Sequence, residues 1–305
     1  MSDTYISTMT RRQFLQFSSV ALLSTYLPEH LLTTSPPNVA EDGLLAGRTF
    51  KSTSVYSFPR ETSDMVEQLW PDSVHPIIGQ TEHWYHIPQG YVPRRTLQPM
   101  LQTTSSEIPD SHTPPFWAEV ATPVAPIYQW CSVEAPLITR IGHGGIMRVV
   151  DRIVNTNRWY GLAEADGQFL GWAQALHWQR VTSRQSTQPV ADYEIAIDVG
   201  RQQLNLLRNQ ELILQAAIST SPLIVPGRFT IAEQITGGTR LNINQDTYHG
   251  VPSVITLNNG QQMTGVYWHN AFGQPVDGPA IQLPYFLASW LANLATFNSA
   301  KVMIK

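Results

Sequence analysis

Short apolar runs that end at glycine- or proline-containing turns make up most of this sequence, which has 19 glycines and 22 prolines. Met147 to Val154 is one such run, and Ala165-Asp166-Gly167 is a turn of the Asp-Gly type that commonly joins two strands. Short strands closed by such turns are typical of small antiparallel barrels. We therefore predict a mainly β chain in which two small β-barrels precede a further β-rich domain.

Composition sets broad limits on the function. The 305 residues are 42% hydrophobic, which is enough for the buried cores of two or three domains. The formal net charge of −4 gives no electrostatic reason to bind nucleic acid or anionic lipid, and neither is expected as a partner. The single cysteine, Cys131, excludes an intrachain disulfide and the cysteine clusters that hold metals. We predict no metal site and no cofactor, and we expect Cys131 to be a buried structural thiol rather than a displaced nucleophile.

The N-terminus carries a motif typical of exported proteins. Thr10-Arg11-Arg12-Gln13-Phe14-Leu15-Gln16 precedes a modestly apolar run from Phe17 to Leu27, and together they resemble a twin-arginine export signal. The run is shorter than the about 20 residues that a transmembrane helix needs. We expect residues 1–43 to be an export signal and linker. No clear Ala-x-Ala cleavage site follows, so cleavage stays open, and an uncleaved signal would act as an N-terminal membrane anchor.

Two segments after the linker, residues 44–101 and 115–181, share an internal pattern. The matching elements are Trp84-Tyr85-His86-Ile87 with Gly90-Tyr91-Val92, and Trp159-Tyr160-Gly161-Leu162 with Gly171-Trp172-Ala173. This pattern resembles bacterial SH3-like domains, which commonly precede cell-wall enzymes. The resemblance implies two SH3-like β-barrels in tandem.

The tryptophans of these segments have two possible roles. Their rings could line a groove for peptide or glycan, because aromatic faces suit both. Packing in the core is the more ordinary role, since large aromatic side chains dominate the interiors of small barrels. We favour the core for each of Trp70, Trp84, Trp130, Trp159, Trp172 and Trp178.

Longer strand patterns begin after Asp192 and define a third segment, residues 190–305. Its predicted strands are Tyr193 to Val199, Leu204 to Leu207, Leu212 to Ser219 and Arg228 to Glu233. Pro284 suits the start of a helix. Apolar residues then recur on one helical face at Leu287, Trp290, Leu291 and Leu294. The segment is predicted to be a β-rich domain with one C-terminal amphipathic helix.

The third segment resembles the catalytic domain of L,D-transpeptidases, the YkuD-like domain that cross-links peptidoglycan. The resemblance begins at Ile197-Asp198-Val199 and continues at Pro226-Gly227-Arg228-Phe229-Thr230-Ile231. It reaches the stretch from Gly265 to Leu283, which contains Tyr267-Trp268-His269-Asn270 and corresponds to the family's active site. A β-rich L,D-transpeptidase-like domain is therefore expected.

The family's reactive residues are missing from this stretch. Where the family has Ser-His-Gly-Cys, this sequence has Asp277-Gly278-Pro279-Ala280, and Gln282 stands where the family has Arg or Asn. The family's chemistry needs a thiolate nucleophile and an imidazole that takes its proton. Ala280 cannot attack an acyl group, and His269 is the one member of the family's set that keeps its identity. The resemblance implies a relic active site that has lost its nucleophile and base.

These patterns favour an exported, cell-wall-associated and catalytically inactive relative of the L,D-transpeptidases. Its expected partner is peptidoglycan, through the stem peptide, or a wall-assembly protein. The residues expected to contact the ligand are Tyr248, His249, Tyr267, Trp268, His269 and Asn270.

Two other interpretations stay open. An active peptidoglycan-modifying transferase or hydrolase could use His269 with Asp277, joined by His249 through a metal, to activate water. A purely structural protein would share every sequence feature with the inactive binder, and binding to purified sacculi would separate these two.

Overall fold

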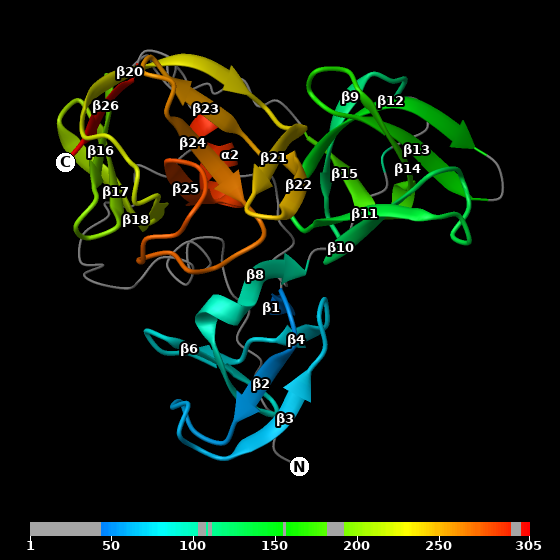
Figure 1. Ribbon diagram of the computed structural model, residues 1–305, viewed down its shortest axis with the longest axis horizontal. Coiled ribbons are helices and arrows are strands. Elements are labelled where there is room, and N and C mark those ends of the chain that lie inside the picture. The colour runs from blue at the N-terminus through cyan, green and yellow to red at the C-terminus, as the bar shows by residue number, and fades with distance from the viewer. Residues whose placement is uncertain (1–43, 103–107, 109–111, 155–156, 182–191, 294–299) are drawn as a thin grey trace. The chain divides into compact units, whose positions relative to one another are not determined.

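The computed structural model describes residues 44–102, 108, 112–154, 157–181, 192–293 and 300–305. The chain divides into two compact units, residues 1–104 and 105–305, and each is described by itself. Most of the described residues with regular structure are in strands, and α2 (Tyr285–Ala292) is the one α-helix among them (Figure 1). The prediction of a mainly β fold with one helix near the C-terminus is confirmed.

The predicted export signal, residues 1–43, lies outside the described residues. Within the ranges that the structure describes, no helix combines the length and the apolar character that a membrane span requires.

The first unit contains two antiparallel sheets, with the strand orders β3-β2-β7-β6-β5 and β4-β1-β8. The elements are β1 (Leu44–Thr49), β2 (Thr53–Tyr56), β3 (Met65–Leu69), β4 (Val74–Pro76), β5 (Gly79–Gln80), β6 (Trp84–Ile87), β7 (Gly90–Pro93), the 3-10 helix η2 (Arg94–Thr96) and β8 (Leu97–Gln102).

The second unit begins with a seven-stranded antiparallel sheet of order β11-β10-β14-β13-β12-β9-β15. The elements are β9 (Phe116–Val120), β10 (Val124–Tyr128), β11 (Leu137–Gly142), β12 (Ile146–Val154), β13 (Arg158–Ala163), β14 (Phe169–Gln174), the 3-10 helix η3 (Ala175–His177) and β15 (Trp178–Arg180).

The two predicted repeats follow the same strand order. Six strands of the first unit have a counterpart at the same place in the second unit. The corresponding pairs are β3 with β11, β2 with β10, β7 with β14, β6 with β13, β1 with β9 and β8 with β15. The remaining strand, β12, pairs with β9 through its first half and with β13 through its second half. In the first unit two short strands share these tasks, since β4 pairs with β1 and β5 pairs with β6. The internal repeat in the sequence is therefore also a repeat of topology.

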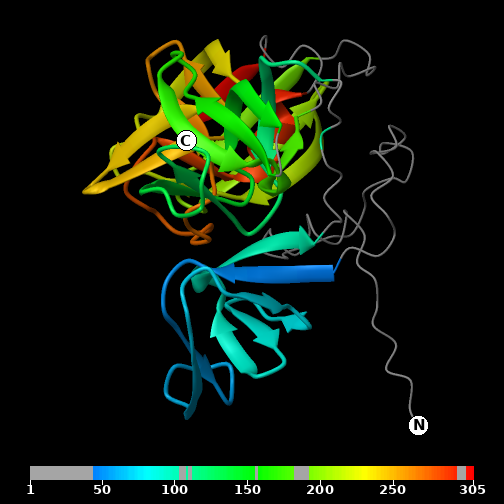
Figure 2. The same cartoon turned by 90° about the vertical axis from the view of Figure 1, so that its right-hand side faces the viewer.

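The rest of the second unit is a nine-stranded, nearly closed sheet and a separate hairpin, β21–β22 (Figures 1 and 2). The strand order of the sheet is β18-β17-β16-β26-β20-β23-β24-β25-β19. The strands are β16 (Tyr193–Asp198), β17 (Gln203–Arg208), β18 (Glu211–Ala217), β19 (Ser219–Thr220), β20 (Gly227–Ile235), β21 (Thr239–Ile243), β22 (Asp246–Val251), β23 (Val254–Leu257), β24 (Gln262–Val266), β25 (Ile281–Pro284) and β26 (Lys301–Ile304). The predicted boundary between residues 115–181 and residues 190–305 stays a prediction, because both segments lie in one compact unit.

Helix α2 packs on the nine-stranded sheet through the apolar face that the sequence predicted. Leu287, Ala288 and Leu291 are buried in the core of that sheet. Gly265 on β24 allows the helix to approach closely, because a Cβ at this position would lie 2.9 Å from the Cβ of Ala288. Leu294, the last residue of the predicted apolar stripe, lies outside the described residues.

The tryptophans differ in burial. Trp159 and Trp178 are buried, and Trp84 and Trp172 are half-buried. Trp70 and Trp130 are exposed. Core packing was therefore the wrong assignment for Trp70 and Trp130, which lie in turns at the ends of strands. Cys131, which follows Trp130, is half-buried rather than buried, and so it also differs from the prediction.

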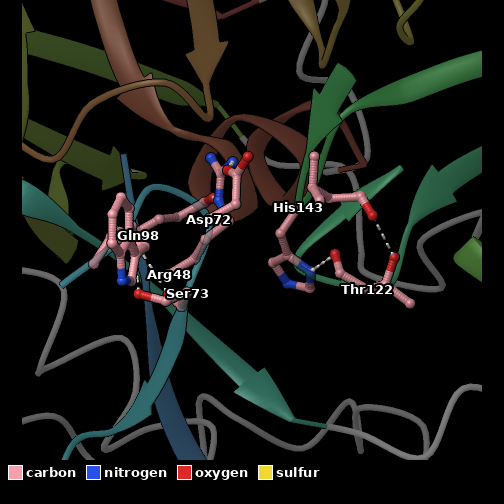
Figure 3. A network of polar contacts seen from close by, with 9 residues as sticks. Arg48, Asp72, Ser73, Gln98, Thr122 and His143 are labelled. Carbon is pink, nitrogen blue, oxygen red and sulfur yellow. Dashed lines mark hydrogen bonds and ion pairs between the residues drawn. The ribbon is translucent and has the colours of Figure 1, made fainter. Parts of the chain in front are cut away.

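A buried arginine joins three parts of the first unit. Arg48 on β1 is 6% exposed, and its Nε donates to Gln98 Oε1 on β8 at 3.0 Å. One terminal nitrogen of the same guanidinium donates to Asp72 Oδ1 at 2.8 Å (Figure 3). A buried charge is tolerated only where protein partners replace the water it has lost. The stability of this unit therefore depends on both partners of Arg48.

We expect Asp72→Asn to destabilise the first unit by about 1–2 kcal/mol, because the buried guanidinium loses its counter-charge. Asparagine tolerates the left-handed backbone of this position, where φ is 61°, so the change isolates the charge. The matched control is Glu61→Gln, which removes the acid of the exposed 2.7 Å ion pair with Arg95 and should change stability by less than about 0.5 kcal/mol. Amide hydrogen exchange in β1 and β8 measures the loss of stability in both variants. An equal loss in the two would contradict the claim that the burial of Arg48 makes its ion pair important.

Candidate functional site

The stretch that resembles the transpeptidase active site connects two neighbouring parallel strands, β24 and β25. The register pairs Thr264 with Gln282 and Gly265 with Leu283. On its other side β25 pairs with β19, where Ser219 lies opposite Gln282. Gln282 is therefore held in the middle of three strands, and the connecting residues 267–280 pass beside it.

Gln282 is the polar centre of this connection. It is 0% exposed, and its side-chain amide meets both ends of the connecting segment. Its Oε1 lies 2.8 Å from His269 Nε2, and its Nε2 donates to the carbonyl of Val276 at 2.9 Å and to that of Asp277 at 3.4 Å. The buried amide thereby fixes the imidazole and the loop relative to each other.

The hydrogen bonds of His269 define its tautomer. The backbone N–H of Ala271 donates to His269 Nδ1 at 3.2 Å, so Nδ1 carries the lone pair. Nε2 therefore carries the proton and donates to Gln282 Oε1. Burial lowers the pKa of His269, and the hydrogen bond with Gln282 opposes this shift in part. The imidazole is consequently neutral near pH 7, and its one basic nitrogen is occupied by a backbone donor.

The segment Asp277-Gly278-Pro279-Ala280 has a backbone conformation that depends on glycine. Gly278 has φ of 131°, a region that side-chain-bearing residues rarely adopt. A Cβ there would lie 3.3 Å from Ile243 Cδ1 and 3.4 Å from the Gln282 amide nitrogen. Ala280 is half-buried against the core of the nine-stranded sheet, and its carbonyl accepts a bond from Ser221 N at 3.0 Å. The loop thus combines a backbone that requires glycine at Gly278 with a half-buried methyl group at Ala280.

A shallow hollow of about 270 Å³ opens between this loop and the tip of hairpin β21–β22. Its lining comprises Leu241, Asn242, Ile243, Asn244, Gln262, Asp277, Gly278 and Pro279. Three of these side chains carry amides and one carries a carboxylate, whereas none is cationic. The hollow can therefore donate to and accept from a polar ligand, and its one charged group is an acid.

The aromatic residues expected to bind a ligand gather on the other side of the same hairpin. Tyr248 stacks on Trp268 with ring centroids 4.4 Å apart, and Tyr267 contacts both rings. Tyr267 is 4% exposed, belongs to the core of the seven-stranded sheet and donates through its hydroxyl to His249 O at 2.7 Å. Asn270 is buried as well. These residues join the two sheets of the second unit, and only Tyr248, His249, Trp268 and His269 keep partial exposure.

A buried acid that the sequence analysis missed holds this hairpin. Glu164, directly after β13, is 4% exposed, and its Oε1 lies 2.6 Å from His249 Nδ1. Its Oε2 lies 3.8 Å from Arg240 Nε on β21. Both partners belong to the hairpin, whereas the acid belongs to the seven-stranded sheet. One carboxylate therefore ties the two strands of the hairpin to the neighbouring sheet.

Backbone contacts beside this acid bring the two sheets close together. Gly238 N donates to Ile146 O at 2.7 Å, and Gly238 O accepts from Ala165 N at 2.9 Å. A Cβ on Gly238 would lie 3.0 Å from the ring of Trp117, and one on Gly237 would meet Ile146. Glycine is needed at both positions because a side chain there would collide with residues of the seven-stranded sheet.

The residues proposed for a non-cysteine reaction have other partners. Gln282 accepts from His269 and donates to the carbonyl of Asp277, whereas His249 is bonded to Glu164. No set of three or more His, Cys, Asp or Glu residues within the described ranges could hold a metal ion. Both nitrogens of His269 are therefore engaged by Ala271 and Gln282 rather than by Asp277.

Solved structures similar to this chain include L,D-transpeptidases. The catalytic domain of the E. faecium enzyme is 16% identical with a TM-score of 0.32, and the match covers 39% of this chain and 100% of that one. An enzyme from Stackebrandtia nassauensis is 13% identical with a TM-score of 0.30 and coverage of 41% and 58%. One from Mycobacterium tuberculosis H37Rv is 10% identical with a TM-score of 0.34 and coverage of 53% and 90%.

This chain spans 58% of the Stackebrandtia structure and 64% of one from Xylanimonas cellulosilytica. No model of a known protein family matches the chain, and no curated protein matches it.

The lowered pKa of His269 predicts a loss of stability in acid. The ordinary pKa of histidine is about 6.5. Below this pH the histidine is protonated in the unfolded chain but stays neutral in the folded protein, so the free energy of unfolding falls. His75 and His177 contribute in the same direction, because burial also lowers their pKa. We therefore expect His269→Gln to retain more of its neutral-pH stability in acid than the wild type does. Denaturant titrations across this pH range provide the measurement, and parallel pH profiles would contradict the assignment.

Removal of the Glu164 carboxylate should loosen the hairpin without unfolding the seven-stranded sheet. In Glu164→Ala, amides of residues 239–251 should exchange hydrogen roughly tenfold faster or more, because His249 and Arg240 lose a buried charged partner. Amides of β10 and β14 report whether that sheet stays folded. The control is Glu134→Ala, an exposed acid in the turn between β10 and β11, and equal acceleration in both variants would exclude Glu164 as the holding residue.

Proposed function

We propose that this protein is an exported, cell-wall-associated relative of the L,D-transpeptidases that has lost acyl transfer and binds peptidoglycan or a wall-assembly partner. The proposal rests on the sequence resemblance of residues 193–305 and on the site around Gln282. Acyl transfer needs a nucleophile and a base that accepts its proton. Ala280 offers a methyl group, and both nitrogens of His269 are engaged by Ala271 and Gln282.

The occupied imidazole is the observation that carries this proposal. A general base must keep a lone pair directed at the proton that it removes. His269 instead accepts a bond from its own chain and donates to a buried amide. The same two contacts argue against the alternative of an active hydrolase or transferase built on His269 and Asp277.

The hollow beside the loop supports a binding role. Side-chain amides of Asn242, Asn244 and Gln262 can pair with the peptide groups of a stem peptide, since each amide both donates and accepts. Apolar atoms of Leu241 and Pro279 can cover the ligand's aliphatic parts. We infer that a peptide segment of peptidoglycan is the ligand.

Export and attachment complete the proposal. The twin-arginine pattern at Arg11-Arg12 supports an extracytoplasmic location, and an uncleaved signal would add a membrane anchor. Two segments that resemble SH3-like domains, residues 44–101 and 115–181, would assist attachment to the wall.

The loss of catalysis is tested with a carbapenem. Incubation of the full chain followed by intact-mass measurement should show no acyl adduct. Cys131→Ser is the matched control, because Cys131 is the single thiol of the chain and could react outside the site. An adduct that persists in Cys131→Ser and disappears in His269→Ala would overturn the claim of inactivity.

The binding role is tested by co-sedimentation with purified sacculi. Asp277→Arg places a long cationic side chain at the hollow and should lower the bound fraction about tenfold at low protein concentration, if the hollow supplies a central contact. Asp246→Arg makes the same charge change on β22, outside the hollow lining. If the full chain stays in solution, or if both variants bind like the wild type, the hollow is not the peptidoglycan site.

A further inference from the structure

Four neighbouring strands of the seven-stranded sheet align an aromatic pair, a glycine and an acid in one row. Tyr128 on β10 lies opposite Trp172 on β14, and Trp172 lies opposite Gly161 on β13. Gly161 in turn lies opposite Asp151 on β12. Residues in direct register share one face of a sheet, so the row crosses one surface.

Gly161 lets the side chains on either side of it meet. A Cβ at this position would lie 3.0 Å from Asp151 Cβ, 3.1 Å from the ring of Phe169 and 3.4 Å from the ring of Trp172. The absent side chain therefore lets an acid and two rings converge closely over the backbone of Gly161. We call the group of Tyr128, Asp151, Phe169 and Trp172 around Gly161 the aromatic corner.

The rings of the aromatic corner stand at steep angles to their neighbours. Phe169 and Trp172 have centroids 5.7 Å apart and planes 65° apart, and Tyr128 meets the buried Trp159 at 78°. Phe169 is 48% exposed, and Tyr128 and Trp172 are half-buried. A flat sugar ring favours a flat aromatic platform, whereas steeply inclined rings can present two faces to one compact group.

The charge of the corner is negative. Asp151 Oδ1 accepts from the backbone N–H of Arg152, and within the described chain no arginine or lysine forms an ion pair with this carboxylate. The neighbouring guanidinium of Arg152 donates to His112 O instead. Burial raises the pKa of the Cys131 thiol, and the negative charge of Asp151 is a second cause of this shift. The negative potential of Asp151 therefore extends to the turn after β10, where Cys131 lies. Aromatic faces and a carboxylate attract the same kind of ligand, a cation.

We propose that the aromatic corner binds a primary ammonium group carried by a peptide, such as a lysine-type side chain. The ammonium would lie beside the carboxylate of Asp151, its counter-charge, and against the exposed parts of the rings of Phe169 and Trp172. The methylene stem of such a side chain would pack on the ring of Phe169, which is 48% exposed. This site is separate from Gln282 and the hollow, and it stands whether or not the role proposed for them is correct.

The test measures fluorescence anisotropy of a labelled oligolysine peptide with the full chain. The peptide should bind, and the same peptide with every side-chain amine acetylated should bind about three- to tenfold more weakly, since cation–π and charge contacts are both lost. Asp151→Asn should reduce lysine-peptide binding to a similar degree. Gly161→Ala should do so as well, because its methyl group would push the acid and the rings out of their present arrangement.

The control Glu211→Gln removes one exposed acid from β18 of the nine-stranded sheet, and its binding should match the wild type. Phe169→Leu keeps an apolar side chain at a half-exposed position and removes the ring, so reduced binding by this folded variant supports a role for the aromatic face. Equal loss in Asp151→Asn and Glu211→Gln would mean general attraction to a negative protein and would overturn the proposal. Binding of a chito-oligosaccharide in place of the lysine peptide would overturn it in favour of a carbohydrate site.

Discussion

One buried amide sets the arrangement of the candidate site. Gln282 sits between β24 and β19, and its side chain joins His269 to the carbonyls of Val276 and Asp277. An amide has one strong acceptor and two donors, which suits a protonated ring nitrogen on one side and loop carbonyls on the other. A neutral residue at this position thus stabilises a neutral imidazole. The local structure therefore holds the imidazole and the loop carbonyls in one fixed arrangement.

The site also depends on a sheet that does not contain it. A two-stranded hairpin is marginal by itself, and β21–β22 pairs with no third strand. Its position comes from Glu164, from the bonds of Gly238 and from the stack of Tyr248 on Trp268. The tip of this hairpin is one wall of the hollow. The seven-stranded sheet therefore acts as a structural part of the candidate binding site, beyond any contact of its own with a ligand.

Strands with clear apolar patterns could be predicted from the sequence, and contacts between distant polar residues could not. Tyr193 to Val199 and Met147 to Val154 match β16 and β12 closely, because turn residues mark their ends. Glu164 precedes an Asp-Gly turn, where an acid is ordinarily solvated, so nothing in the local sequence indicates that it is buried against His249. Tyr267 was expected to contact a ligand, yet its ring completes a core contributed almost entirely by another sheet. Such roles follow from the packing of the two sheets and leave no periodic signal.

The loop shows how one backbone position limits the side chains that it can carry. Gly278 has a φ of 131°, a backbone angle that a residue with a side chain would resist. The space beside Gly278 is bounded by Ile243 of the hairpin and by the Gln282 amide, so a larger side chain would displace both. Ile243 belongs to the hairpin that Glu164 holds through Arg240. Gln282 is held on β25 between β19 and β24. The proposed loss of acyl transfer therefore rests on the backbone at Gly278 and its fixed neighbours as well as on Ala280, and the same fixed neighbours give the hollow a defined shape.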